Sequence, residues 1–136
     1  MNTIKKILAM TVLIISCSLF CFSQDAANSE KINNAIKKGN AKELAQFFNS
    51  SIELVVIKNE NVYSKSQAEL ILADFFKKYK PVGFSVQHNG QSKNSKYAIG
   101  TLNTKLGSFR VYYLTKPKKN SHSLIYLLRI EKKDKF

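Results

Sequence analysis

The chain has 136 residues, of which 44% are apolar and 23% are charged, a length and composition typical of one folded domain and not of a disordered chain. Its 5 glycines and 2 prolines exclude a low-complexity or linker-rich protein. The net charge of +13 favours anionic partners such as lipid headgroups, acidic glycans or nucleic acid.

The N-terminus has the layout of a secretory signal. Lys5 and Lys6 precede an apolar segment over residues 7–22, and Cys21-Phe22-Ser23 matches the small-x-small pattern that signal peptidases cleave. We therefore predict a signal peptide over residues 1–23 and a single mature domain over residues 24–136. The mature chain contains no apolar run long enough to span a membrane, so we expect it in the periplasm or outside the cell.

A second cleavage pattern gives an alternative location. Ile14-Ile15-Ser16-Cys17 fits the pattern of bacterial lipoproteins, which would leave the protein anchored through an acylated Cys17. Cys17 and Cys21 both lie in the signal, so the mature domain has no disulfide, no thiolate nucleophile and no cysteine metal site. Without Lys5 and Lys6 the net charge is +11, and export argues against nucleic acid as the partner.

Three amphipathic segments predict helices. The first runs from about Asn28 to Lys38 and stops at Gly39. Asn40 starts the second, and the spacing to Glu43 predicts a capping box. The third starts after Ser64, carries apolar residues every three to four positions, and ends before a proline. The apolar stripes of the second and third helices comprise Leu44, Phe47, Phe48, Ala68, Ile71, Leu72, Phe75, Phe76 and Tyr79.

The remaining segments predict antiparallel strands. Ser51–Lys58 is followed by a turn over residues 59–61 and by the short strand Val62-Tyr63. After Gly83 the apolar period changes from 3.6 to 2. This change predicts a four-stranded meander that begins at residue 84 and continues through residues 97–104, 108–116 and 123–131. Asn89-Gly90 is expected to open a polar loop to Ser95 after the first of these strands. We expect an α+β fold with the order α-α-β-β-α-β-β-β-β, in which the helices cover one face of a curved sheet and form a cone.

This order of elements resembles the nuclear-transport-factor-two-like superfamily, also called cystatin-like or SnoaL-like. The residues that carry a closer resemblance are Phe75-Phe76, Pro81, Phe84, His88-x-Gly90, Tyr97-x-Ile99-Gly100-x-Leu102-x-Thr104, Gly107 and Phe109-Arg110. They are similar to a family of small exported proteins of Bacteroidetes with no assigned function, which implies a fold and an envelope location. Enzymes of the superfamily use pocket carboxylates with Tyr or His. This chain departs from their pattern because it has no acidic residue between Phe84 and Ile130.

The candidate site residues come from the predicted sheet. His88 shares a strand face with Phe84 and Val86, which would place an imidazole in the cone as a weak candidate for a general base. Tyr97, Arg110, Tyr112 and Arg129 could bind an anionic group there, although a structural histidine and arginines paired with Glu53 or Glu131 are the simpler readings. The sequence contains no metal-ligand cluster, nucleophile elbow or phosphate loop, so we predict no metal and no cofactor.

Three functions remain open at this point. The favoured hypothesis is an exported envelope protein that binds a small or acidic ligand, or a protein partner, without catalysis. The first alternative is an isomerase or lyase in which His88 is the general base and Tyr97 or Arg110 polarises the substrate. The second is a structural scaffold. Residues 124–128 are apolar on both faces, with Leu124, Tyr126 and Leu128 on one and Ile125 and Leu127 on the other, which also predicts a homodimer through the outer sheet face.

Overall fold

The protein folds around one six-stranded sheet with helices on one of its faces. The computed structural model describes residues 1–9, 23–119 and 122–134. The strand order is β2-β1-β6-β5-β4-β3, all neighbours being antiparallel except the parallel pair β1 and β6. The strands are β1 Phe48–Val56, β2 Asn59–Ser64, β3 Pro81–Ser92, β4 Ser95–Thr104, β5 Gly107–Lys116 and β6 Leu124–Lys132.

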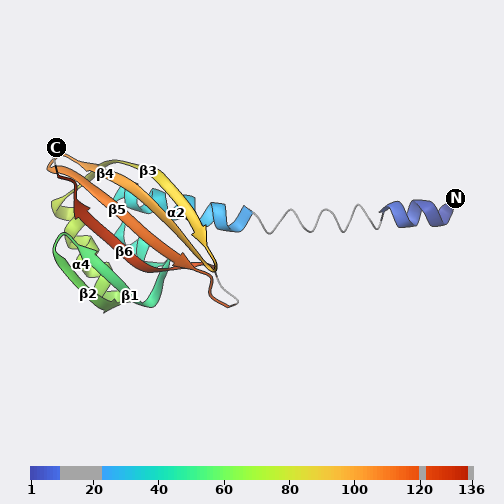
Figure 1. Ribbon diagram of the computed structural model, residues 1–136, viewed down its shortest axis with the longest axis horizontal. Helices are drawn as coiled ribbons and strands as arrows, with labels where there is room; N and C mark the ends of the chain where they lie inside the picture. Colours follow the sequence, from blue (N-terminus) through green and yellow to red (C-terminus); the bar gives the residue numbers. More distant parts are fainter. Residues whose placement is uncertain (10–22, 120–121, 135–136) are drawn as a thin grey trace.

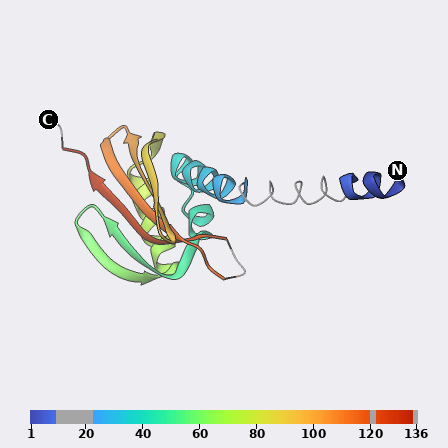
Figure 2. The same cartoon turned by 45° about the vertical axis from the view of Figure 1, so that its right-hand side comes forward.

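Helices α2 (Ser23–Lys38), α3 (Ala41–Ala45) and α4 (Lys65–Lys78) lie on the same face of this curved sheet (Figures 1 and 2). α2 packs against β3, α4 packs against β1 and β2, and α3 lies between the two longer helices. The predicted α+β cone and its order of elements are confirmed. Among the described residues, no helix is long and apolar enough to cross a membrane.

Local sequence signals explain where the helices begin and end. Gly39 has a φ of 65°, and the N–H groups of Gly39 and Asn40 donate to carbonyls of the last turn of α2. Ser64 and Gln67 form the expected capping box at the start of α4. At α3 only half of the predicted box forms: Asn40 Oδ1 accepts from the Glu43 N–H, while the carboxylate of Glu43 accepts from the Asn40 side chain.

Several predicted boundaries are wrong. α2 begins at Ser23 rather than near Asn28, and the rest of the predicted signal core, with Cys17 and Cys21, lies outside the described residues. Phe48 belongs to β1 rather than to the second helix, and its side chain is buried in the core beneath the sheet.

Two turns are also shorter than the sequence predicts. The β1–β2 turn is Ile57-Lys58, which begins two residues earlier than expected, and the Ile57 N–H donates to the Ile130 carbonyl at 2.7 Å. The polar stretch after Asn89, predicted as a loop, is paired as strand to Ser92 and leaves residues 93–94 as the turn.

Two irregularities change which residues share a face of the sheet. The β3–β4 register shifts between Val86 and His88, so Gln87 is the extra residue. The β5–β6 register shifts in the same way, with Tyr126 as the extra residue. The prediction that Ile125 and Leu127 share a face is therefore wrong: Ile125 is fully buried beneath the helices, whereas Leu127 lies on the outer face.

The core fills one end of the cone more completely than the other. Phe75, Tyr79 and Phe109 form an aromatic cluster with ring centroids 4.9–5.1 Å apart, where α4 ends and β5 begins. Together with Phe76, these rings occupy the space beneath that end of the sheet. Within the part of the chain that the structure describes, the opposite end, beneath the β3–β4 turn, carries no comparable aromatic cluster, and a pocket lies there.

Candidate functional site

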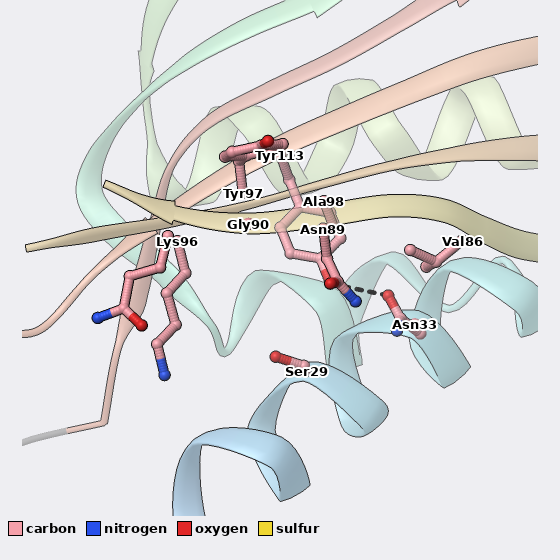
Figure 3. Close-up of a pocket in the computed structure, with 10 residues that line it drawn as sticks. Ser29, Asn33, Val86, Asn89, Gly90, Lys96, Tyr97, Ala98 and Tyr113 are labelled. Carbon is pink, nitrogen blue, oxygen red and sulfur yellow. Dashed lines mark hydrogen bonds between the residues drawn. The ribbon is translucent and has the colours of Figure 1, made fainter. Parts of the chain in front are cut away.

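The pocket lies between the N-terminal half of α2 and the far ends of β3, β4 and β5 (Figure 3). Its volume is about 340 Å³, at the lower end of the range of about 300–1,000 Å³ usual for small-molecule sites. Its lining residues are Ser29, Asn33, Val86, Asn89, Gly90, Gln91, Lys96, Tyr97, Ala98 and Tyr113. Most of these residues carry hydroxyl, amide or amine groups, and these polar groups lie beside apolar surface.

Tyr113 is the deepest polar group of the pocket. Its ring is only 3% exposed, and its hydroxyl donates a hydrogen bond to Asn33 Oδ1 at 2.8 Å, joining β5 to α2. Burial raises the pKa of Tyr113 to about 12. The phenol is therefore neutral at physiological pH and acts as a fixed donor, not as a base.

The α2 side chains reach the pocket because of their helical spacing. Ser29 and Asn33 are four residues apart and so lie on one side of the helix, next to the buried positions Ile32 and Ile36. Figure 3 shows Ser29, Asn33, Asn89 and Lys96 around the space between the strand ends and the helix.

This set of groups suits binding better than proton transfer. The lining residues include no carboxylate, no imidazole and no thiol. The described residues also contain no group of three or more His, Cys, Asp or Glu side chains that could hold a metal ion. What the pocket offers is a set of hydrogen-bond donors and acceptors from Ser29, Asn33, Asn89 and Gln91, with the cationic Lys96 beside them.

The structure places His88 on the other side of the sheet. The bulge at Gln87 shifts the alternation by one residue, so Asn89 takes the inward position that continues from Val86. His88 is exposed and is not among the residues that line the pocket. The prediction that His88 shares a face with Phe84 and Val86 is wrong, and with it the placement of an imidazole in the cone.

The other four predicted site residues also belong to the outer face. Arg110, Tyr112 and Arg129 alternate with the buried residues Val111 and Ile130, and none of the three lines the pocket. Tyr97 contributes to the rim of the pocket, but its side chain points away from α2 in Figure 3.

Tyr97, Tyr112 and Arg129 contact other side chains of the outer face. Tyr97 stacks on Tyr112 with ring centroids 6.1 Å apart, and it covers Gly90 so closely that an added Cβ there would lie 2.6 Å from its hydroxyl. Arg129 crosses β1 above Val55 and forms an ion pair with Glu60 at 3.3 Å, rather than with Glu53 or Glu131. Its Nε is buried without a hydrogen-bond partner.

Sequence reasoning missed Asn33, Asn89 and Tyr113. A signal was present in α2, because Ser29 and Asn33 form a polar pair beside the apolar stripe. Tyr113 could have been found because residues 109, 111 and 113 share one face of the strand, and Phe109 and Val111 on that face are buried. Asn89 lies on the inner face because of the bulge at Gln87, and no residue pattern in β3 predicts that bulge.

Comparison with known proteins assigns the chain to a family. The family model described as a domain of unknown function, DUF4783, matches residues 29–131. The chain belongs to the DUF4783 family. This confirms the resemblance to an uncharacterised family of Bacteroidetes, and no curated protein matches the chain.

Crystal structures of DUF4783 proteins have the same fold. The protein from Bacteroides ovatus is 33% identical, with 77% of this chain and 94% of its own chain aligned at a TM-score of 0.72. The protein from Bacteroides uniformis is 32% identical, with 78% and 97% aligned at a TM-score of 0.74.

Similarity of fold extends beyond DUF4783. A domain of unknown function with a cystatin-like fold from Nostoc punctiforme aligns at a TM-score of 0.64 with 11% identity, covering 83% of this chain and 79% of its own. At such low identity the likeness concerns the fold alone.

Proposed function

We propose that this DUF4783 protein is an exported envelope protein that binds a small, polar or acidic molecule in the pocket between α2 and β3–β5, without catalysing a reaction. The observation that carries the proposal is the set of polar side chains on the pocket wall. The buried, neutral phenol of Tyr113 donates a hydrogen bond to Asn33, and the positively charged Lys96 lies on the same wall. Such a wall suits a ligand with several oxygen acceptors, such as a carboxylate or a hydroxylated compound.

The absence of a carboxylate, an imidazole or a thiol among the lining residues favours binding over the isomerase or lyase alternative. General acid–base catalysis needs a group that exchanges its proton near neutral pH. Tyr113 keeps its proton, and His88 lies on the outer face.

A ligand screen with matched variants tests this proposal. The chain is screened against small carboxylates and sugars by thermal shift, and each hit is measured again with Tyr113→Phe and with Tyr112→Phe. Tyr113→Phe should weaken a pocket ligand by about 5- to 10-fold, because Asn33 loses the hydrogen bond that fixes its side chain at the pocket, while Tyr112→Phe leaves affinity unchanged. Ligands that bind both variants equally, or no hit at all, would count against the pocket.

The location is proposed from the N-terminal segment alone. We propose cleavage after Ser23, with anchorage through Cys17 as the alternative. Mass spectrometry of the chain recovered from the exporting cell distinguishes the two, because the first outcome begins at Gln24 and the second carries a diacylglycerol on Cys17.

We also propose a homodimer through the outer face of the sheet. Half-buried apolar side chains gather there on three neighbouring strands, and they are Tyr97, Ile99, Tyr112, Leu114 and Leu127. Light scattering at micromolar concentration should give the mass of two chains. Leu127→Lys should convert the dimer to a monomer, whereas Val62→Lys, at an exposed apolar residue on β2, should not.

A further inference from the structure

Lysines gather at the end of the molecule opposite the pocket. Helices α2 and α4 end there, β3 starts there, and the β4–β5 turn and the end of β6 lie beside them, near the C-terminus in Figure 1. Three hollows of about 660, 470 and 380 Å³ follow one another across this end, because the first two share Lys80 and Pro81 and the last two share Leu106. We call this surface the basic end, and its eight lysines are Lys38, Lys42, Lys77, Lys78, Lys80, Lys105, Lys132 and Lys133.

The charge of the basic end is nearly uncompensated. All eight lysines are exposed, and Asp134 is the one acidic residue among those that line the three hollows. Within residues 1–9, 23–119 and 122–134, none of the eight forms an ion pair. Lys78 lies over the Tyr79 ring and Lys133 donates to Thr101, so these two are partly fixed in place.

The basic end also exposes apolar side chains among its lysines. Val82 is 62% exposed and Leu106 is 65% exposed, and both line the hollow that is bounded by Lys78, Lys80 and Lys105. Neither apolar side chain is needed by the core. A surface that combines lysines with protruding aliphatic groups has the two components that hold a protein at a lipid headgroup layer.

The type of cation points in the same direction. The lining residues of the three hollows include no arginine, so the surface lacks the rigid bidentate groups that recognise one phosphate or carboxylate geometrically. Flexible lysine ammonium groups are suited to a diffuse layer of negative charge. An acidic polysaccharide would satisfy the lysines but would have no use for Val82 and Leu106.

We propose that the basic end docks the protein on a membrane surface rich in anionic phospholipid, with Val82 and Leu106 entering the headgroup layer. The pocket beneath the β3–β4 turn then faces away from the lipid, because the two sites lie at opposite ends of the strands (Figure 1). This docking surface is independent of the ligand pocket, so either proposal can fail without the other.

Vesicle sedimentation of the full chain, in the form processed by the expressing cell, tests the proposal. Vesicles of phosphatidylcholine are compared with vesicles that also contain phosphatidylglycerol, at low and high salt. A triple reversal at the basic end (Lys78→Glu, Lys80→Glu and Lys105→Glu) is matched by a reversal of three exposed lysines elsewhere, at Lys65, Lys118 and Lys119. The two triple variants have the same net charge and the same N-terminal segment.

We expect binding to the anionic vesicles that weakens with salt. The basic-end triple should lose at least about tenfold in affinity, because each lysine near an anionic surface contributes roughly fivefold, while the matched triple should lose less than about threefold. Equal losses in the two triples would overturn the proposal, since binding would then follow net charge alone. Circular dichroism melts of both triples verify that each is folded.

A second variant separates lipid from soluble polyanions. Leu106→Ser should weaken vesicle binding severalfold and leave binding to heparin, a soluble acidic glycan, unchanged, because the leucine is exposed and only the lipid layer accepts it. If Leu106→Ser binds vesicles as well as the unmodified chain does, or if heparin binds more tightly than the vesicles, the surface is a polyanion site and the membrane proposal is wrong.

Discussion

Replacing Tyr113 by phenylalanine measures how much one hydroxyl contributes to the stability of the packing of α2 against β5. The ring stays in the core, and only the hydrogen bond to Asn33 Oδ1, 2.8 Å long, is removed. Such a bond contributes about 0.5–1.5 kcal/mol net, and water can replace part of it because Asn33 is only half-buried. We expect Tyr113→Phe to lower the free energy of unfolding by about 1 kcal/mol at neutral pH.

The same hydroxyl makes this difference depend on pH. Burial raises the pKa of Tyr113 from 10.0 to about 12 in the folded protein. Because the folded-state pKa is the higher one, the unmodified chain keeps its full stability below about pH 10 and loses stability as the pH rises toward 12. The loss reaches about 1.4 kcal/mol near pH 11 and about 2–3 kcal/mol over the whole window. Tyr113→Phe lacks this loss.

Urea unfolding at pH 7, 9 and 11, followed by circular dichroism, measures both effects. Tyr113→Phe should be the less stable protein at pH 7 and 9, and should equal or exceed the unmodified chain near pH 11. Tyr112→Phe, on the outer face, controls for the loss of a tyrosine hydroxyl and should stay within about 0.5 kcal/mol at every pH. A deficit in Tyr113→Phe that is constant from pH 7 to 11 would refute the burial of this hydroxyl.

Three further substitutions test the fold and the assignment of faces. Gly100→Ala should destabilise by about 1–3 kcal/mol in urea unfolding, because its Cβ would lie 2.6 Å from the Phe84 ring; an unchanged midpoint would mean that this ring is not packed on Gly100. Ser64→Ala should cost about 1 kcal/mol through loss of the cap on α4, with Gln67→Ala as the partner variant in a double-mutant cycle that should reveal coupling. His88→Ala should change the melting temperature and pocket-ligand affinity very little, and a tenfold loss of affinity would return this histidine to the binding site.

The sequence predicted the elements of this fold better than the faces of its strands. Capping residues and helical stripes are local signals, so α4 and the end of α2 were placed correctly from Ser64, Gln67 and Gly39. The face on which a strand residue lies depends on an unbroken alternation. The bulge at Gln87 reverses that alternation within β3 and exchanges His88 for Asn89.

The candidate site was missed for a related reason. Apolar residues flank Tyr97, Arg110 and Arg129 on strands whose two faces both carry apolar groups, so the residue pattern contains no criterion for which face the helices cover. The inner face is marked instead by small residues such as Ala98 and Gly100, which leave room for neighbouring side chains. The periodicity of apolar residues does not identify positions whose importance lies in the small size of the side chain.

The parallel pairing of β1 with β6 sets the order in which this protein can become stable. Their paired residues are separated by more than half of the chain, and β6 lies between β1 and β5 as the strand that joins the hairpin β1–β2 to the meander. A nascent chain can form its hairpins early, but it cannot connect its two halves until residues 124–132 have been synthesised. Folding is therefore expected to finish only at the end of translation or after it, so the sheet stays incomplete for most of the synthesis of the polypeptide.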